Sequence, residues 1–131
     1  MEKFLSSTPA LKALRSLVAK YASKGYVPGL DGRKIWVRSE HAALNSLLQG
    51  AGAIVMKQAL VILDEALRKR KVWYGFCANV HDEWQIETKA EHAELVGALA
   101  VDAIKQAGEF FKLRCPLSGE YHIGKTWKDT H

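Results

Sequence analysis

Hydrophobic residues recur at steps of three and four in three segments of the chain, and this spacing predicts three helices. The first is expected to begin at Pro9, with Thr8 as its N-cap, and to end near Gly25. The second would run from about Glu40 to Arg70, with Ser39 as its cap. The third would run from about Lys89 to Lys112, with Thr88 and Glu91 as a capping box at its start. At ~1.5 Å per residue, the second helix would be roughly 45 Å long. That length indicates that it reaches beyond the core of so small a domain, across further protein or along a long ligand.

Between the helices, runs of β-branched and aromatic residues predict strands. Tyr26-Val27 and the run from Lys34 to Arg38 flank a stretch of turn-forming residues, which is typical of a hairpin. A second hairpin is expected from Val72–Val80 and Trp84–Glu87, and a last strand between Leu117 and Ile123. We therefore expect an α+β fold in which antiparallel hairpins pack against three helices, one of them long, in a single unit.

Two glycines, Gly50 and Gly52, interrupt the predicted long helix. Each costs about 1 kcal/mol of helix propensity relative to alanine. A close approach of another segment to the helix backbone would explain them, and simple tolerance would explain them equally well.

The sharpest chemical feature is the Val80-His81-Asp82-Glu83 sequence, which a two-residue turn at His81 and Asp82 would place at a hairpin tip. Such turns favour glycine because they need positive φ, so strain is expected here beside two carboxylates. Strain at a tip of this kind is typical of a site. The alternative is that Asp82 and Glu83 are ordinary solvated turn residues. The register would pair Val80 with Glu83 and Asn79 with Trp84, and would place Cys77, Trp84 and Ile86 on one apolar face.

A second polar constellation lies at the start of the long helix. His41, Asn45 and Gln49 follow one another at steps of four, so they lie along one helical face. Such a row could read a nucleic-acid backbone or groove, or it could be the plain polar face of an amphipathic helix. Arg33 and Arg38 precede it and make contact with phosphates more credible.

Composition narrows the class of protein. The chain has 131 residues, 48% hydrophobic, and a formal net charge of +5, which suits a polyanionic partner without requiring one. The two cysteines are far apart, so neither a disulfide scaffold nor a zinc site is expected. We see no secretory signal, and Lys57 and Gln58 interrupt the most apolar stretch, so no membrane span is expected. These features predict a cytoplasmic protein.

The chain resembles the C-terminal part of family A (polymerase I-like) DNA polymerases, especially the phage type. The resemblance runs from about Thr8 to His131, with matching blocks in the family's order. The blocks are Asp31-Gly32-Arg33, residues 38–53, Val80-His81-Asp82-Glu83, Gly124-Lys125-Thr126-Trp127 and the terminal His131. The resemblance implies that residues 1–38 lead out of the fingers and that residues 39–131 form palm, with a metal-binding hairpin.

By this resemblance, Asp82 occupies the place of one of two aspartates that hold two Mg²⁺ ions, and Glu83 that of the neighbouring carboxylate. His81 would lie near the primer end. Asn45 and Gln49 match positions that contact the template–primer in its minor groove. His41 stands where bacterial members carry arginine and phage members can carry histidine.

The resemblance also implies what this sequence lacks. The family's second metal-binding aspartate and the fingers helix that grips dNTP have no counterpart here, so the chain alone should not extend a primer. We expect it to complete an active site with an upstream polymerase chain, or to self-associate, in a bacterial or phage-infected cell. A catalytically dead remnant that binds DNA or oligomerises is the alternative. An unrelated metal hydrolase using His81 and Asp82 is a third hypothesis, with no further ligand cluster in its favour.

Overall fold

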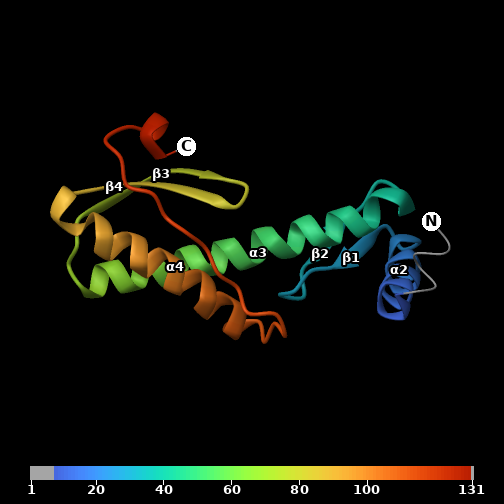
Figure 1. The fold of residues 1–131 in the computed structure, drawn as a ribbon. Coiled ribbons are helices and arrows are strands. Elements are labelled where there is room, and N and C mark those ends of the chain that lie inside the picture. The colour runs from blue at the N-terminus through green and yellow to red at the C-terminus, as the bar shows by residue number, and fades with distance from the viewer. Residues whose placement is uncertain (1–7, 131) are drawn as a thin grey trace. The chain divides into compact units, whose positions relative to one another are not determined.

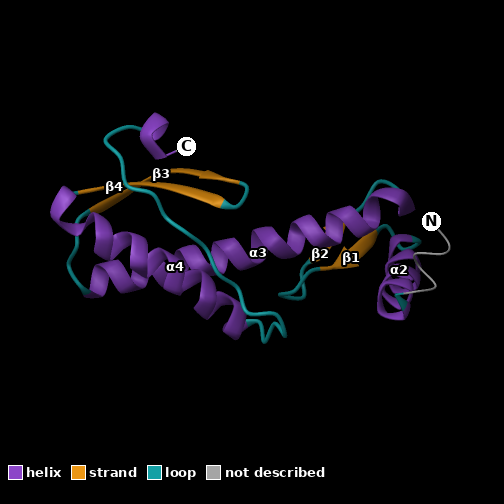
Figure 2. Ribbon diagram, in the orientation of Figure 1, coloured by secondary structure: helices purple, strands orange, loops and turns teal. Residues whose placement is uncertain are grey.

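The computed structural model describes residues 8–130 of the chain. It has the expected α+β composition: the described residues form three α-helices and two antiparallel two-stranded sheets (Figures 1 and 2). Met1 to Ser7 and the terminal His131, which carried part of the resemblance, lie outside the described residues. Contacts between residues group the chain into two compact units, Met1–Ile54 and Val55–His131.

The first unit contains helix α2 (Pro9–Ala22), strands β1 (Tyr26–Pro28) and β2 (Lys34–Trp36), and the beginning of helix α3 (Glu40–Lys69). Pro9 follows the N-cap Thr8, as expected. The chain leaves α2 through Gly25, whose φ of 84° suits a residue without a Cβ. Apolar side chains from each element close the core of this unit, with Val18, Val27 and Ala43 at its centre.

The β1–β2 hairpin packs on the first half of α3, and Gly50 is the reason it can come so close. A Cβ on Gly50 would lie 2.5 Å from Ile35 Cδ1, whereas one on Gly52 would meet nothing within 4 Å. Close approach therefore explains Gly50, and tolerance explains Gly52. The N-terminus of α3 is capped as predicted, because the Ala42 amide donates to Ser39 Oγ over 3.3 Å.

The second unit packs helix α4 (Ala93–Phe110) and the hairpin of β3 (Tyr74–Val80) and β4 (Glu83–Thr88) against the second half of α3. Its core draws on α3, α4 and the hairpin, and its buried members are Val55, Ala59, Leu63, Leu67, Val72, Val96, Ala103 and Ala107. At the end of α3, the Tyr74 hydroxyl donates to Asp64, which also accepts from Arg68 Nε over 2.8 Å. That network ties β3 to the helix.

Two sequence expectations about the second unit are wrong. Thr88 does not cap α4; its hydroxyl donates to the Trp73 carbonyl over 2.8 Å, and the helix begins through the 3₁₀ turn η1 (Ala90–His92). Residues 117–123 form no strand, because their backbone runs beside α4, which offers no free hydrogen-bonding edge (Figure 1). The chain then ends in a second 3₁₀ turn, η2 (Trp127–Thr130), which the sequence did not indicate.

The expectation of no membrane-length apolar stretch also needs correction. By length and composition, α3 is apolar enough to cross a membrane, with an 18-residue window of mean hydropathy 1.5, despite Lys57 and Gln58. Only 22% of that window is buried. The core helices of water-soluble proteins meet the same criterion of length and composition.

Candidate metal-binding hairpin and nucleic-acid-binding helix

The tip of the β3–β4 hairpin has the geometry that the sequence predicts. Val80 pairs with Glu83 and Asn79 with Trp84, so His81 and Asp82 form the two-residue turn (Figure 2). His81 adopts a φ of 54°, in the left-handed region that costs a side chain of its size some strain. The tip is therefore a β-bend held in an unfavourable conformation, with Asp82 exposed at its end.

The register slips by one residue farther from the tip. A bulge between Phe76 and Ala78 leaves Cys77 without a strand partner and brings Phe76 opposite Ile86. The expectation that Cys77 shares the apolar face with Ile86 is therefore wrong: the Cys77 thiol is exposed, and Phe76 takes that place. In a strand of seven residues, the alternation of polar and apolar side chains is too short to reveal one extra residue.

Glu83 is half-buried and held by its own strand. The Gln85 amide Nε2 donates to Glu83 Oε1, because residues two apart on a strand share a face. The Gln85 side-chain oxygen Oε1 in turn accepts from the Thr130 hydroxyl over 3.5 Å, at the long limit of a hydrogen bond. Gln85 and Thr130 are not among the residues that the sequence predicts for this site. The two-residue spacing from Glu83 could have indicated Gln85. Thr130 lies 45 residues away from Gln85 in the sequence, so only the tertiary fold places it there.

The η2 turn that supplies Thr130 is organised by one carboxylate. Asp129 Oδ2 accepts from the hydroxyl and the amide of Thr126, each over 2.9 Å, and from the amide of Lys125 over 3.1 Å. These bonds favour the ionised form, the Thr126 hydroxyl most of all, so the pKa of Asp129 lies below its ordinary value. The turn is thus held in place while that carboxylate is charged.

The donor set at the tip suits a hard divalent cation only in part. Two adjacent carboxylates, Asp82 and Glu83, offer the oxygen ligands that Mg²⁺ prefers. Within residues 8–130, no group of three or more His, Cys, Asp or Glu side chains could hold a metal ion. The tip can therefore contribute ligands to a metal site, and the rest of the coordination must come from water, substrate or other protein.

The polar row on α3 lies within the first unit and faces solvent. His41, Asn45 and Gln49 are all exposed, as is Arg38 just before the helix. Arg33 is differently placed. Its guanidinium pairs with Asp31 Oδ2 over 2.6 Å across the β1–β2 turn, so it can reach a phosphate only by sharing that contact.

The same ion pair fixes the charge of the turn. Desolvation of the Asp31 carboxylate is outweighed by the hydrogen bonds and the charge of Arg33, and the pKa of Asp31 lies below its ordinary value.

Positive charge is concentrated in the first unit. Residues 8–54 carry seven Lys and Arg against two Asp and Glu, whereas residues 55–131 carry eleven of each. The whole formal net charge of +5 therefore falls on the part of the chain that bears the polar row. A polyanion would be drawn to this unit rather than to the acidic hairpin.

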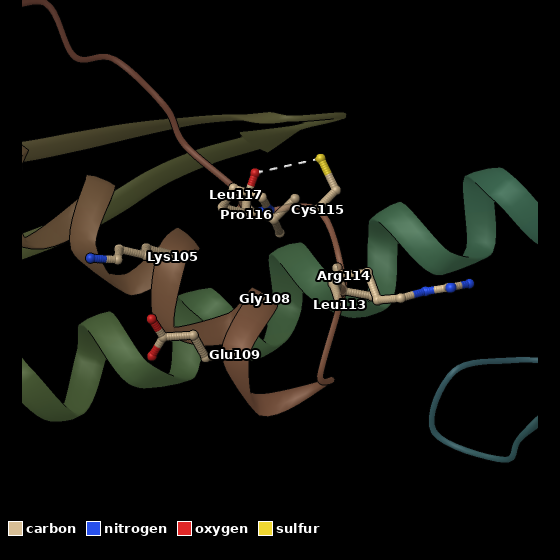
Figure 3. Close-up of a pocket in the computed structure, with 8 residues that line it drawn as sticks. All are labelled: Lys105, Gly108, Glu109, Leu113, Arg114, Cys115, Pro116 and Leu117. Carbon is tan, nitrogen blue, oxygen red and sulfur yellow. Dashed lines mark hydrogen bonds between the residues drawn. The ribbon is translucent and has the colours of Figure 1, made fainter.

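A pocket of about 190 Å³ lies at the end of α4, away from the hairpin tip (Figure 3). The loop after the helix closes it, and Figure 3 shows Lys105 and Glu109 on the helix side and Arg114 on the loop side. Its lining consists of Lys105, Gly108, Glu109, Leu113, Arg114, Cys115, Pro116 and Leu117. None of the residues singled out for chemistry lines it.

Comparison with known proteins relates this arrangement to one family. A family profile described as DNA polymerase family A matches residues 1–129. The DNA-directed DNA polymerase of Escherichia phage Phieco32 is 36% identical over 143 residues, which cover 98% of this chain and 22% of that protein. The corresponding polymerase of Escherichia phage T7 is 34% identical over 152 residues, covering 99% of this chain and 22% of that protein. DNA polymerase I of Geobacillus stearothermophilus is 32% identical over 142 residues, covering 98% and 16%.

A solved structure shows the same fold. The POL domain of Pol1 from M. smegmatis, in complex with DNA primer-template and dNTP, matches 82% of this chain and 21% of its own with a TM-score of 0.71. At 23% sequence identity, this match establishes the fold alone. The chain spans about a fifth of the length of the phage relatives that it matches.

Proposed function

This chain belongs to DNA polymerase family A, and from that premise we propose that it forms the C-terminal part of the palm of a DNA-directed DNA polymerase. In this proposal, residues 1–38 lead out of the fingers, and residues 39–131 are palm. The relatives are polymerases of phages and bacteria, so its setting is the cytoplasm of a bacterial or phage-infected cell.

The β3–β4 tip supplies carboxylates to the polymerase active site. Asp82, exposed at the end of the bend, would be a direct ligand for Mg²⁺, and Glu83 would add a second oxygen donor that Gln85 orients. Two Mg²⁺ ions, held by these carboxylates and by the family's second metal-binding aspartate, would stabilise the attacking 3′-oxygen and the leaving pyrophosphate. His81 lies beside the primer end, held there by its left-handed backbone. The tip geometry is the single observation that carries the proposal.

The exposed row on α3 binds the paired template–primer. Asn45 and Gln49 donate and accept hydrogen bonds at the minor-groove edges, and His41 lies at the start of the same face. Arg38 contacts phosphate, and Arg33 does so while sharing its guanidinium with Asp31. The concentration of positive charge in residues 8–54 supports this assignment.

Further protein completes the site. The second metal-binding aspartate and the dNTP-gripping helix that the family requires have no counterpart in these 131 residues. The β3–β4 sheet has only two strands in the described part of the chain, so each has an edge without a strand neighbour. Trp73 and Val80 are 53% and 43% exposed on the same hairpin region. The upstream part of the polymerase, whether on this polypeptide or on a separate chain, or a second copy of this chain covers these surfaces.

Primer extension tests the proposal. The chain is mixed with the upstream part of a phage family A polymerase, a primed template and dNTPs. We expect Mg²⁺-dependent synthesis that neither component gives alone and that Asp82→Ala abolishes. Asp102→Ala is the matched control, because Asp102 is an exposed carboxylate on α4 that accepts a hydrogen bond from the Gln106 amide. Synthesis that survives Asp82→Ala would overturn the metal assignment.

A DNA-binding remnant without catalytic function is the second candidate, and the charge of the first unit favours it. In that case the chain alone would bind primed duplex with a steep dependence on salt, and no partner would restore synthesis. Alanine at both Asn45 and Gln49 would weaken duplex binding under either hypothesis. Only the extension assay separates the two.

A further inference from the structure

Trp36 is 73% exposed, the largest exposed fraction of any large hydrophobic side chain in the described residues. The alternation of β2 explains why. Ile35 turns inward against Gly50, so its neighbours Lys34 and Trp36 must both face solvent. Trp36 is absent from the buried core of the first unit, and most of the indole surface stays in water, which points to a use outside the core.

Two tyrosines extend the exposed indole into a continuous aromatic surface. Trp36 lies opposite Tyr26 in the β1–β2 register, and their ring centroids are 6.0 Å apart in an edge-to-face arrangement. Tyr21, on α2, lies 6.1 Å from Tyr26 with a tilt of 56°. Both tyrosines are half-buried, so they support the indole from one side and leave it open on the other. We refer to Tyr21, Tyr26 and Trp36 as the aromatic patch.

Lysines flank the aromatic patch. Lys34 Nζ lies 4.9 Å from the ring centre of Tyr26, and Lys24 Nζ lies 5.7 Å from that of Tyr21. Both lysines are exposed. Cation–π contacts of this kind hold the ammonium groups next to the rings, where they can also meet an anion.

The positive charge around the aromatic patch favours binding of a polyanion over binding of a protein that has an apolar surface or few acidic residues. The two acidic residues of the described first unit are Asp31 and Glu40, and Asp31 is already paired with Arg33. Exposed aromatic rings interleaved with lysines on a basic surface are what proteins use to bind single strands, because bases stack on rings while phosphates meet cations.

We propose that the aromatic patch, with Lys24 and Lys34, binds unpaired single-stranded DNA, and that Trp36 stacks on a base. The patch lies on the hairpin and α2, whereas the row assigned to paired DNA lies on α3. It therefore adds a second DNA contact of a different kind. It does not depend on the metal assignment, because it needs only the first unit.

Binding of a short fluorescein-labelled oligothymidylate to the whole chain, followed by fluorescence anisotropy at low salt, tests the proposal. Trp36→Ala should weaken binding about 5- to 150-fold, the range expected for loss of one stacked base. Trp36→Phe keeps an aromatic face and should retain most of the affinity. Trp73→Ala is the matched control, because Trp73 is also 53% exposed but lies in the second unit; it should leave binding unchanged.

Two further measurements separate stacking from general attraction. Oligothymidylate should quench tryptophan emission in the original chain and in Trp73→Ala, but far less in Trp36→Phe. Alanine at Lys24 or Lys34 should each reduce the slope of log affinity against log salt by about 0.7.

Three outcomes would overturn the proposal: no single-strand binding by the original chain, equal affinity in Trp36→Ala, or an equal loss in Trp73→Ala. Circular dichroism of each variant excludes unfolding as the cause. Loss of synthesis in the extension assay would leave this binding intact, so the two proposals fail separately.

Discussion

The ring of Tyr121 lies directly on Gly97, so close that a Cβ on the glycine would stand 2.3 Å from Tyr121 Cδ2. The Tyr121 hydroxyl then donates to Glu94 Oε2 over 2.8 Å, one turn earlier on α4. This bond raises the pKa of Tyr121 above its ordinary value. Because Gly97 has no side chain, the C-terminal segment can pack directly against the backbone of α4 at this position.

Gly97→Ala should lift that segment from α4. The new methyl group cannot share its space with the ring, so Tyr121 must swing out and lose Glu94. Overpacking costs about 1–3 kcal/mol, against a gain in helix propensity of about 1 kcal/mol. We expect the pKa of Tyr121, followed by ultraviolet titration, to fall toward its ordinary value, and cleavage by protease after Tyr121 to quicken. An unchanged Tyr121 titration would contradict the contact.

Gly50 and Gly52 should respond differently to alanine. Gly52→Ala enters open space and should stabilise the helix by about 1 kcal/mol. In Gly50→Ala the end of the Ile35 side chain must move, so the net change in stability should be a smaller gain than for Gly52→Ala, or a loss. Urea denaturation of the two variants side by side measures the difference. Equal stabilisation would mean that the hairpin does not approach α3 at Gly50.

His81→Gly should stabilise the hairpin while impairing synthesis. The left-handed backbone costs histidine about 1 kcal/mol, which glycine recovers in part. The reconstituted polymerase should nevertheless lose activity, because the substitution removes the side chain that we propose lies beside the primer end. Lys112→Gly is the control: Lys112 has a φ of 53° just after α4, so it should give a similar gain in thermal stability without loss of synthesis.

Acid should loosen the η2 turn through Asp129. Its pKa in the folded chain lies below the ordinary value of 3.8, so the fold favours the charged form. The contribution is complete above about pH 3.8 and is lost as the pH falls through the lowered pKa. The amide resonances of Lys125 and Thr126 should follow that titration in nuclear magnetic resonance spectra. Asp129→Asn should abolish the dependence, and a midpoint at or above 3.8 would contradict the hydrogen bonds.

The sequence predicted most of the helices and strands because the spacing of apolar residues within each segment indicates its type. The apolar steps of α3 gave its ends to within one residue, Glu40–Lys69 against Glu40 to Arg70. The paired residues around His81 and Asp82 were predicted correctly because a two-residue turn leaves one register. The failures at Cys77 and residues 117–123 have a different origin. A bulge and an unpaired extended segment depend on neighbours far along the chain.

The amino-acid sequence by itself determined that this chain has an α+β fold, that it belongs with the polymerases, and that Asp82 stands at a strained bend. The fold class and the bend follow from periodicity and turn chemistry, which act over a few positions, whereas the relation to the polymerases rests on blocks of matching residues along the chain. Only the tertiary structure decided that Ile35 packs against Gly50 and that Tyr121 packs against Gly97. It likewise decided that Gln85 hydrogen-bonds to both Glu83 and Thr130. It also decided that Trp36 is left in water. Such relationships depend on which surfaces meet, and packing of distant segments selects them.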